Sequence, residues 1–90
     1  MNKDNQPTCQ IDESGNKFWI LNGEFHRGDK PAIEWADGAK SWYHHGYLHR
    51  LNGPAIEHFN GNKFWYYYGE KINVSSQEEF ERLIKLKALW

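Results

Sequence analysis

The apolar positions of this chain form short runs separated by turn residues, and most successive glycines stand seven or eight residues apart. The run Phe18–Leu21, for example, ends at Asn22-Gly23, a dipeptide typical of tight β-hairpins. Apolar runs this short, bounded by glycine and asparagine, are typical of strands rather than helices. The pattern therefore predicts short antiparallel strands joined by tight turns.

The pattern repeats with one fixed period, which is the interval from Gly15 to Gly38 and again from Gly38 to Gly61. Many matches at one offset are the signature of a repeat architecture. The other matched positions are Lys17, Lys40 and Lys63, Trp19, Trp42 and Trp65, the His-Arg pairs at 26–27 and 49–50, and the Pro-Ala-Ile-Glu runs at 31–34 and 54–57. The sequence thus predicts two and a half β units over residues 15–73.

These units predict a mainly β fold, a twisted antiparallel meander of roughly six strands within one domain that spans residues 1–90. Because neighbouring strand residues point to opposite faces, we expect the three tryptophans on one face and Phe18, Ser41 and Phe64 on the other. The polar segment 1–14 is expected to be flexible or to add an edge strand around Cys9 to Ile11.

A C-terminal helix is predicted within residues 74–90, where no glycine interrupts the chain. Ser75 with Glu78, or Ser76 with Glu79, fits a capping box at the start of a helix. The residues that follow place apolar side chains at helical spacing. This stripe consists of Phe80, Leu83 and Ile84, with Trp90 further on. We expect the helix to pack on the sheet and to cover one of its two aromatic faces, and the sequence leaves open which one.

Composition narrows the classes of function. The 90 residues carry 11 Lys plus Arg and 12 Asp plus Glu, a net charge of −1, which argues against a general nucleic-acid binder. The single cysteine excludes an internal disulfide and fits a reducing cytoplasm. No apolar run approaches the roughly 20 residues of a membrane helix, and the polar N-terminus lacks a signal peptide's apolar stretch. Aromatic residues make up 17% of the chain, so aromatic rings must form much of its core.

The units read G-x-K-x-W-x-x-x-G-x-x-H-R-x-x-x-P-A-I-E. This pattern resembles the MORN-like repeat variants of small phage, bacterial and giant-virus proteins, and the resemblance covers residues 15–73. Lys30 departs from the pattern in the first unit, and Ile72-Asn73 replaces His-Arg in the third. The resemblance implies scaffolding and binding. It makes a phage-type inhibitor or regulator of a host protein, acting in the host cytoplasm, a plausible hypothesis.

Protein binding without catalysis is the predicted function, because tyrosine, tryptophan and arginine are enriched at interface hot spots. The candidate partner-binding residues are Tyr43, His45, Tyr47, Tyr66, Tyr68, Arg27 and Arg50. The arginines have a structural alternative, in which each guanidinium stacks on a tryptophan or pairs with Glu34 or Glu57. No catalytic residues are predicted, since Cys9 has no nucleophile motif around it and the glutamates occupy repeat positions.

The histidines offer a metal site as an alternative. With Glu34 or Glu57 they are ligand types for zinc or nickel, but the sequence has no H-E-x-x-H or comparable spacing. The structural alternative for His26 and His49 is a hydrogen bond to a turn backbone or packing on a tryptophan. His44-His45 is expected to be an exposed turn. We therefore predict no metal and no cofactor.

Two further functions remain open. The tryptophans and the recurring lysines could form a stacking platform for single-stranded nucleic acid. Residues 15–73, however, hold seven basic and six acidic side chains, a net charge of only +1. An exposed sheet edge could also pair with a partner or with a second copy of the chain, as a homodimer.

Overall fold

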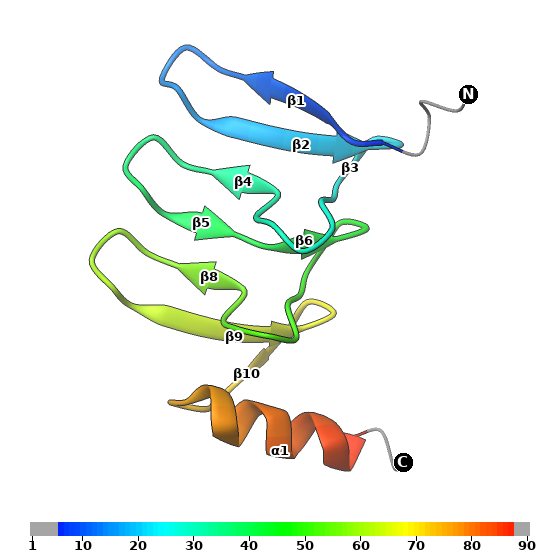
Figure 1. The fold of residues 1–90 in the computed structure, drawn as a ribbon, viewed down its shortest axis with the longest axis vertical. Coiled ribbons are helices and arrows are strands. Elements are labelled where there is room, and N and C mark those ends of the chain that lie inside the picture. The colour runs from blue at the N-terminus through cyan, green and yellow to red at the C-terminus, as the bar shows by residue number, and fades with distance from the viewer. Residues whose placement is uncertain (1–5, 88–90) are drawn as a thin grey trace.

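The repeat of the sequence becomes a stack of β-hairpins in the computed structural model, which describes residues 6–87 (Figure 1). The principal extents are 38 × 35 × 16 Å, so the molecule is a slab little more than one sheet thick. The strands lie in the plane of the slab, and the helix closes the C-terminal end of the stack (Figure 1).

The strands pair antiparallel in the order β1-β2-β4-β5-β8-β9-β10, with β3 on β2, and β6 pairs with β7 in a separate ribbon. The elements are β1 (Thr8–Ile11), β2 (Lys17–Leu21), β3 (Glu24–Phe25), β4 (Ile33–Glu34), β5 (Lys40–Ser41), β6 (Tyr43–His44), β7 (Tyr47–Leu48), β8 (Ile56–Glu57), β9 (Lys63–Tyr67), β10 (Glu70–Ile72) and α1 (Gln77–Lys87). The predicted mainly β meander with one C-terminal helix is confirmed.

The strands are shorter and more numerous than the turns alone suggested. Residues 6–87 hold ten strands rather than roughly six. The predicted strand through Trp42 is divided there, because Trp42 has no partner in the strand registers, whereas Trp19 pairs with Cys9 and Trp65 with Ile72. At the N-terminus, β1 pairs along β2, with Cys9 opposite Trp19, so the edge-strand alternative for this segment is the observed one.

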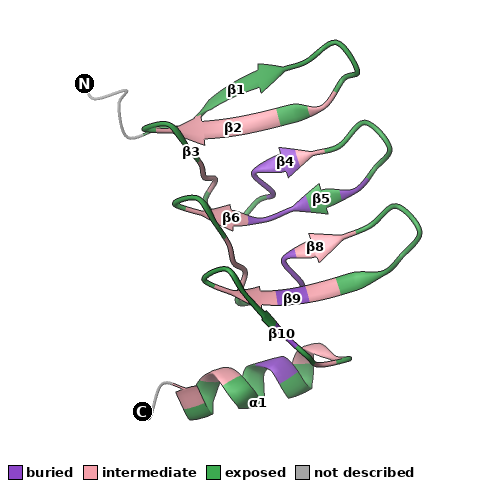
Figure 2. Cartoon of the chain, turned by 180° about the vertical axis from the view of Figure 1, so that it is seen from behind, coloured by how far each residue is buried: buried purple, intermediate pink, exposed green. Residues whose placement is uncertain are grey.

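One edge of the slab carries three equivalent hairpin loops. Trp35 N–H bonds to Ala39 O, and one unit later His58 N–H bonds to Asn62 O. The first loop repeats this bond between Asp12 and Asn16. Figure 2 shows all three loops as exposed segments on the same side of the stack.

The opposite edge carries three tight turns. Asn22, His45 and Tyr68 have φ angles of 53°, 48° and 46°, and each precedes a glycine with positive φ. Two consecutive positive φ angles define the type I′ turn that matches the twist of a hairpin. Asparagine and histidine are the more common residues at positive φ, whereas tyrosine adopts this conformation at a cost in strain. The last turn therefore needs support from its surroundings.

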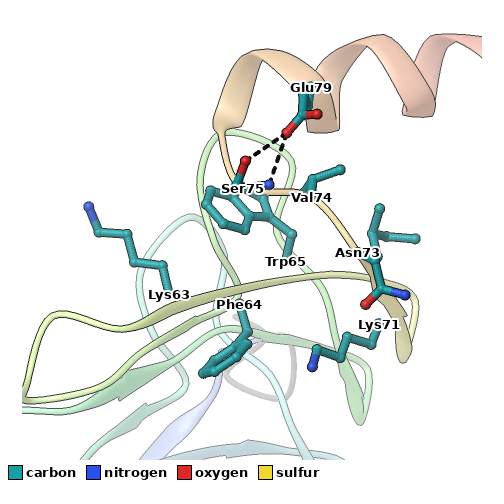
Figure 3. Close-up of a pocket in the computed structure, with 9 residues that line it drawn as sticks. Lys63, Phe64, Trp65, Lys71, Asn73, Val74, Ser75 and Glu79 are labelled. Atoms are coloured by element: carbon teal, nitrogen blue, oxygen red, sulfur yellow. Dashed lines mark hydrogen bonds between the residues drawn. The ribbon is translucent and has the colours of Figure 1, made fainter.

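The register separates the two faces of the sheet as predicted. Phe18 pairs through Ile33 to Ser41, and Ser41 pairs through Ile56 to Phe64. These residues share one face, because directly paired residues point the same way. The tryptophans occupy the alternate positions and so lie on the other face. Figure 3 shows Phe64 and Trp65 on opposite sides of β9.

Helix α1 covers the tryptophan face only at the last unit. Its buried residue Phe80, which is 0% exposed, forms a core cluster with Trp65 and Ile72. At its start, Glu79 N–H bonds to Ser76 Oγ at 3.2 Å, and Glu79 Oε1 accepts the Ser75 N–H at 2.9 Å (Figure 3). The Ser76–Glu79 capping interaction is confirmed, with its return bond directed one residue earlier than in a standard capping box.

Candidate functional site: the joints and the turn edge

In the first full unit, the tryptophan is covered by an arginine of the same unit. The guanidinium carbon of Arg27 lies 3.6 Å from the ring centroid of Trp19. Its Nη1 donates to Glu34 Oε2 and to Pro31 O, both at 3.2 Å. One side chain therefore links a ring, a carboxylate and a turn carbonyl.

The second full unit repeats this arrangement. Arg50 lies 3.7 Å from the Trp42 ring centroid, and its Nη1 donates at 3.1 Å to both Glu57 Oε2 and Pro54 O. The Arg50 side chain is 20% exposed. The structural alternative for the arginines, stacking on tryptophan and pairing with glutamate, is confirmed in both units.

The last unit covers its tryptophan differently. Asn73 stands where the other units have arginine, and α1 occupies the space above Trp65. The Trp65 Nε1–H donates to Gln77 Oε1 at 2.8 Å. The same amide group donates from Nε2 to Leu51 O at 2.9 Å, which ties the helix start to the preceding unit.

Consecutive units are joined by a histidine that accepts a hydrogen bond from the next turn. His26 Nδ1 accepts the N–H of His45 at 3.0 Å, and Phe25 O accepts the N–H of Gly46 at 2.9 Å. The His26 and His45 rings stack with centroids 4.2 Å apart, and the His44 ring lies beside both. We call the cluster of His26, His44 and His45 the first joint.

The next unit makes the same joint with different side chains. His49 Nδ1 accepts the N–H of Tyr68 at 3.0 Å, and Leu48 O accepts the N–H of Gly69 at 2.7 Å. The His49 and Tyr68 rings stack with centroids 3.9 Å apart. We call the cluster of His49, Tyr67 and Tyr68 the second joint. Hydrogen bonding to a turn backbone, the structural alternative for His26 and His49, is thus confirmed.

Both joint histidines resist protonation. Burial lowers the pKa of His26, and nearby His45 and His44 lower it further, against an opposing effect of Glu24. Burial is also the main cause that lowers the pKa of His49, with a smaller contribution from His44. An imidazole nitrogen accepts a hydrogen bond only while it is unprotonated, so a lowered pKa preserves both joints.

Three of the predicted partner-binding residues gather at the last two tight turns, His45 and Tyr68 on the turns and Tyr47 directly after the first of them. His45, Tyr47 and Tyr68 are exposed, with Tyr47 at 57% and Tyr68 at 50%. Figure 2 shows these turns along one edge of the stack. Tyr47 also packs against Gly69, where a Cβ atom would stand 3.1 Å from its ring. We call His45, Tyr47 and Tyr68 the turn-edge patch.

The other predicted residues lie elsewhere. Tyr43 and Tyr66 are half-buried at alternate strand positions, on the face opposite the tryptophans. The Tyr43 ring lies 5.2 Å from that of Phe25, and burial raises the pKa of Tyr43, with a smaller contribution from Tyr66. The two arginines lie on the tryptophan face. The structure therefore brings together His45, Tyr47 and Tyr68 and separates the remaining four candidates from them.

The recurring lysines alternate with glutamates across the sheet. Lys17 pairs with Glu34, Glu34 with Lys40, Lys40 with Glu57, and Glu57 with Lys63. This row lies on the tryptophan face, where each positive charge has a negative neighbour. The lysines therefore do not form a continuous basic stripe.

The histidine cluster of the first joint is the feature that sequence reasoning missed. His26 belongs to the first full unit and His44 and His45 to the second, so no local motif reveals the cluster. The repeat pattern could have indicated this cluster, because stacked units bring the turn at His45 against the preceding unit. The exposed Phe59, on the loop edge, was also not singled out.

Comparison with family models, curated proteins and solved structures found no match. Within residues 6–87, no helix is long and apolar enough to cross a membrane.

Proposed function

We propose that this protein is a non-catalytic module that binds another protein through the turn-edge patch. The observation that carries the proposal is the exposure of two tyrosines and a histidine on turns that are fixed by hydrogen bonds and ring stacking. Aromatic side chains supply large contact areas, and rings that are already ordered lose little entropy on binding. The patch is therefore a preorganised set of the residue types that favour protein interfaces.

Nucleic-acid binding has weaker support. A stacking platform needs open aromatic faces, but Arg27 and Arg50 lie over Trp19 and Trp42, and α1 lies over Trp65. The lysines on the same face alternate with glutamates. The tryptophan face therefore offers neither open rings nor a net positive track.

The resemblance to MORN-like repeat variants supports a more specific form of the proposal. A small regulator or inhibitor that binds a host protein in the host cytoplasm fits the exposed aromatic patch and the single exposed cysteine.

The proposal is tested by capture of partners with the immobilised chain from a lysate of its host cells. The patch variant is Tyr47→Ser/Tyr68→Asn, in which asparagine suits the positive φ of residue 68. The matched control is Phe59→Ser, because Phe59 is 70% exposed but lies in the hairpin loop between His58 and Asn62, on the opposite edge. Circular dichroism establishes that both variants fold.

We expect one partner protein in stoichiometric amount with the wild type and with Phe59→Ser, and at least tenfold less with the patch variant. Hydrogen exchange on the purified complex should then protect residues 44–48 and 67–70. Equal capture by the patch variant would contradict the assignment of the patch. Nuclease-sensitive capture, or recovery only of further copies of this chain, would replace protein recognition by nucleic-acid binding or self-association.

A further inference from the structure

Three histidines meet at the first joint although they belong to two different units. Each offers a ring nitrogen, and the three nitrogens lie within 4.8 Å of one another. The ring centroids are 4.2 Å apart for His26 and His45, 4.6 Å for His44 and His45, and 4.9 Å for His26 and His44. His45 is exposed and the other two are half-buried, so an ion from solution can reach the cluster.

The second joint shows that the fold does not require histidine at these places. His49, Tyr67 and Tyr68 occupy the equivalent positions one unit further along the chain. Their ring centroids are 3.9, 4.9 and 5.2 Å apart, close to the spacing in the first joint. Tyrosine thus supplies the same stacking and accepts the same positive φ. What histidine adds at positions 44 and 45 is a pair of ring nitrogens.

We propose that the first joint binds one divalent transition-metal ion of the zinc or nickel class through nitrogens of His26, His44 and His45. Imidazole is a favoured ligand of both metals. Glu24 Oε1 lies 3.6 Å from His45 Nδ1, which places a carboxylate where it can orient the His45 ring or complete the coordination. No comparable carboxylate contact is found at the second joint among the described residues.

Binding of an ion changes the hydrogen bonding of His26. Metal binding requires neutral imidazole. The ion competes with the turn, since a neutral imidazole has one unprotonated nitrogen and that of His26 already accepts the His45 N–H. Whichever nitrogen of His26 binds the ion, this hydrogen bond must break. The ion then joins the two units in its place.

This competition gives the site a specific spectroscopic signature. When Zn²⁺ is added to the chelator-treated, ¹⁵N-labelled full chain, the amide resonance of His45 should shift strongly. The amide of Tyr68, which bonds to His49 in the second joint, should stay close to its original position. An unchanged His45 amide at saturating Zn²⁺ would overturn the proposed ligation by His26.

Calorimetric titration with Zn²⁺ and Ni²⁺ tests the ligands directly. We expect one ion per wild-type chain. H44Y/H45Y, which copies the second joint into the first, should bind at least about 100-fold more weakly, because even outer-shell changes at metal sites cost about 10- to 100-fold in affinity. If H44Y/H45Y fails to fold, His26→Gln replaces it, since the glutamine oxygen can still accept a turn N–H while the ring nitrogens are removed. Affinity equal to that of the wild type in the folded variant would overturn the site.

The converse variant, Y47E/Y67H/Y68H, gives the second joint three histidines and, at the position equivalent to Glu24, a carboxylate. If the joint geometry determines the site, this variant should bind two ions per chain. A stoichiometry that stays at one in the folded variant would show that these side chains in this arrangement do not suffice, and would overturn the argument from geometry.

Discussion

Trp42 and Trp65 occupy the same place in consecutive units and are buried to nearly the same extent, 7% and 6% exposed. Their covers differ in kind. Arg50, eight residues after Trp42, lies over its ring while pairing with Glu57. Trp65 is covered by Phe80 from the helix that follows the repeats.

The two covers differ in whether the indole N–H of the tryptophan has a hydrogen-bond acceptor. Trp42 Nε1 is buried with no hydrogen-bond partner, whereas Trp65 Nε1 donates to Gln77. The arginine cover is built within one unit and is repeated, but Arg50 remains partly exposed and the Trp42 Nε1 stays unpaired. The helix cover is made once, and its Phe80 is fully buried. Repeat proteins commonly differ in this way between inner units and caps, because a terminal repeat has no neighbour to bury its surface.

The largest predicted loss of stability comes from removing the helix cover. Phe80→Ala should reduce the free energy of unfolding by about 3–5 kcal/mol, the usual cost of truncating a buried phenylalanine. Urea unfolding followed by circular dichroism measures this change. Leu83→Ala is the matched control on the same helix, because Leu83 is 39% exposed, and it should cost less than about 1 kcal/mol. Equal losses in the two variants would show that α1 is not anchored through Phe80.

A smaller loss of stability is expected from removing the arginine cover. Arg50→Ala should cost about 1–2 kcal/mol, since a cation–π contact contributes about 0.5–1 kcal/mol and a partly exposed ion pair about 0.2–1 kcal/mol. Arg50→Lys keeps the charge but lacks the planar fork, so it should recover only part of the loss. The same unfolding assay compares the variants. Full recovery by lysine would indicate that charge alone, rather than stacking on Trp42, stabilises the unit.

The smallest predicted effect is a pH dependence of stability that arises from the histidine joints and not from the helix cover. The pKa values of His26 and His49 are lowered in the folded chain, so the unfolded chain binds protons more readily. Their contribution to stability is therefore complete above about pH 6.5, the ordinary histidine value, and falls as the pH drops below it. Unfolding titrations at pH 7.5, 6.5 and 5.5 should show this decline.

The matched variant for the pH series is His26→Gln/His49→Gln, which keeps an acceptor for each turn but cannot titrate in this range. Its stability should change less between pH 7.5 and 5.5 than that of the wild type. Asp12 and Glu79 also have lowered pKa values, but they titrate at more acidic pH and do not disturb this window. Parallel pH profiles would show that other groups cause the decline.

Much of the fold follows from the sequence, because a repeat fixes the register once its period is known. The turn at Asn22-Gly23, the two faces and a helix start at Ser75 or Ser76 all follow from local patterns, and the structure selects Ser76. The covers over the tryptophans do not. The helix was expected to lie on the sheet, yet it covers only the last unit, because arginines already cover the other two.

The candidate site was less accessible to sequence reasoning. Exposure at the turn edge depends on which strand positions face outward, and Tyr43 and Tyr66 proved half-buried while Tyr47 and Tyr68 are exposed. The first joint depends on contacts between units, and local spacing carries no information about them. Placing the turn of one unit in contact with the end of the previous unit would have brought His45 beside His26.

The stack of units can be lengthened, because its inner units are bounded by equivalent surfaces. The inner units contact their neighbours through the same bonds at each step, and within residues 6–87 the element specific to one end is α1. A further copy of one unit inserted between two others would meet the surfaces it already fits, and would add two strands, or about 9–10 Å, to the long dimension. The architecture is therefore extensible: the span of the turn edge, and with it the reach of any contact along it, can change in steps of one unit without redesign of the core.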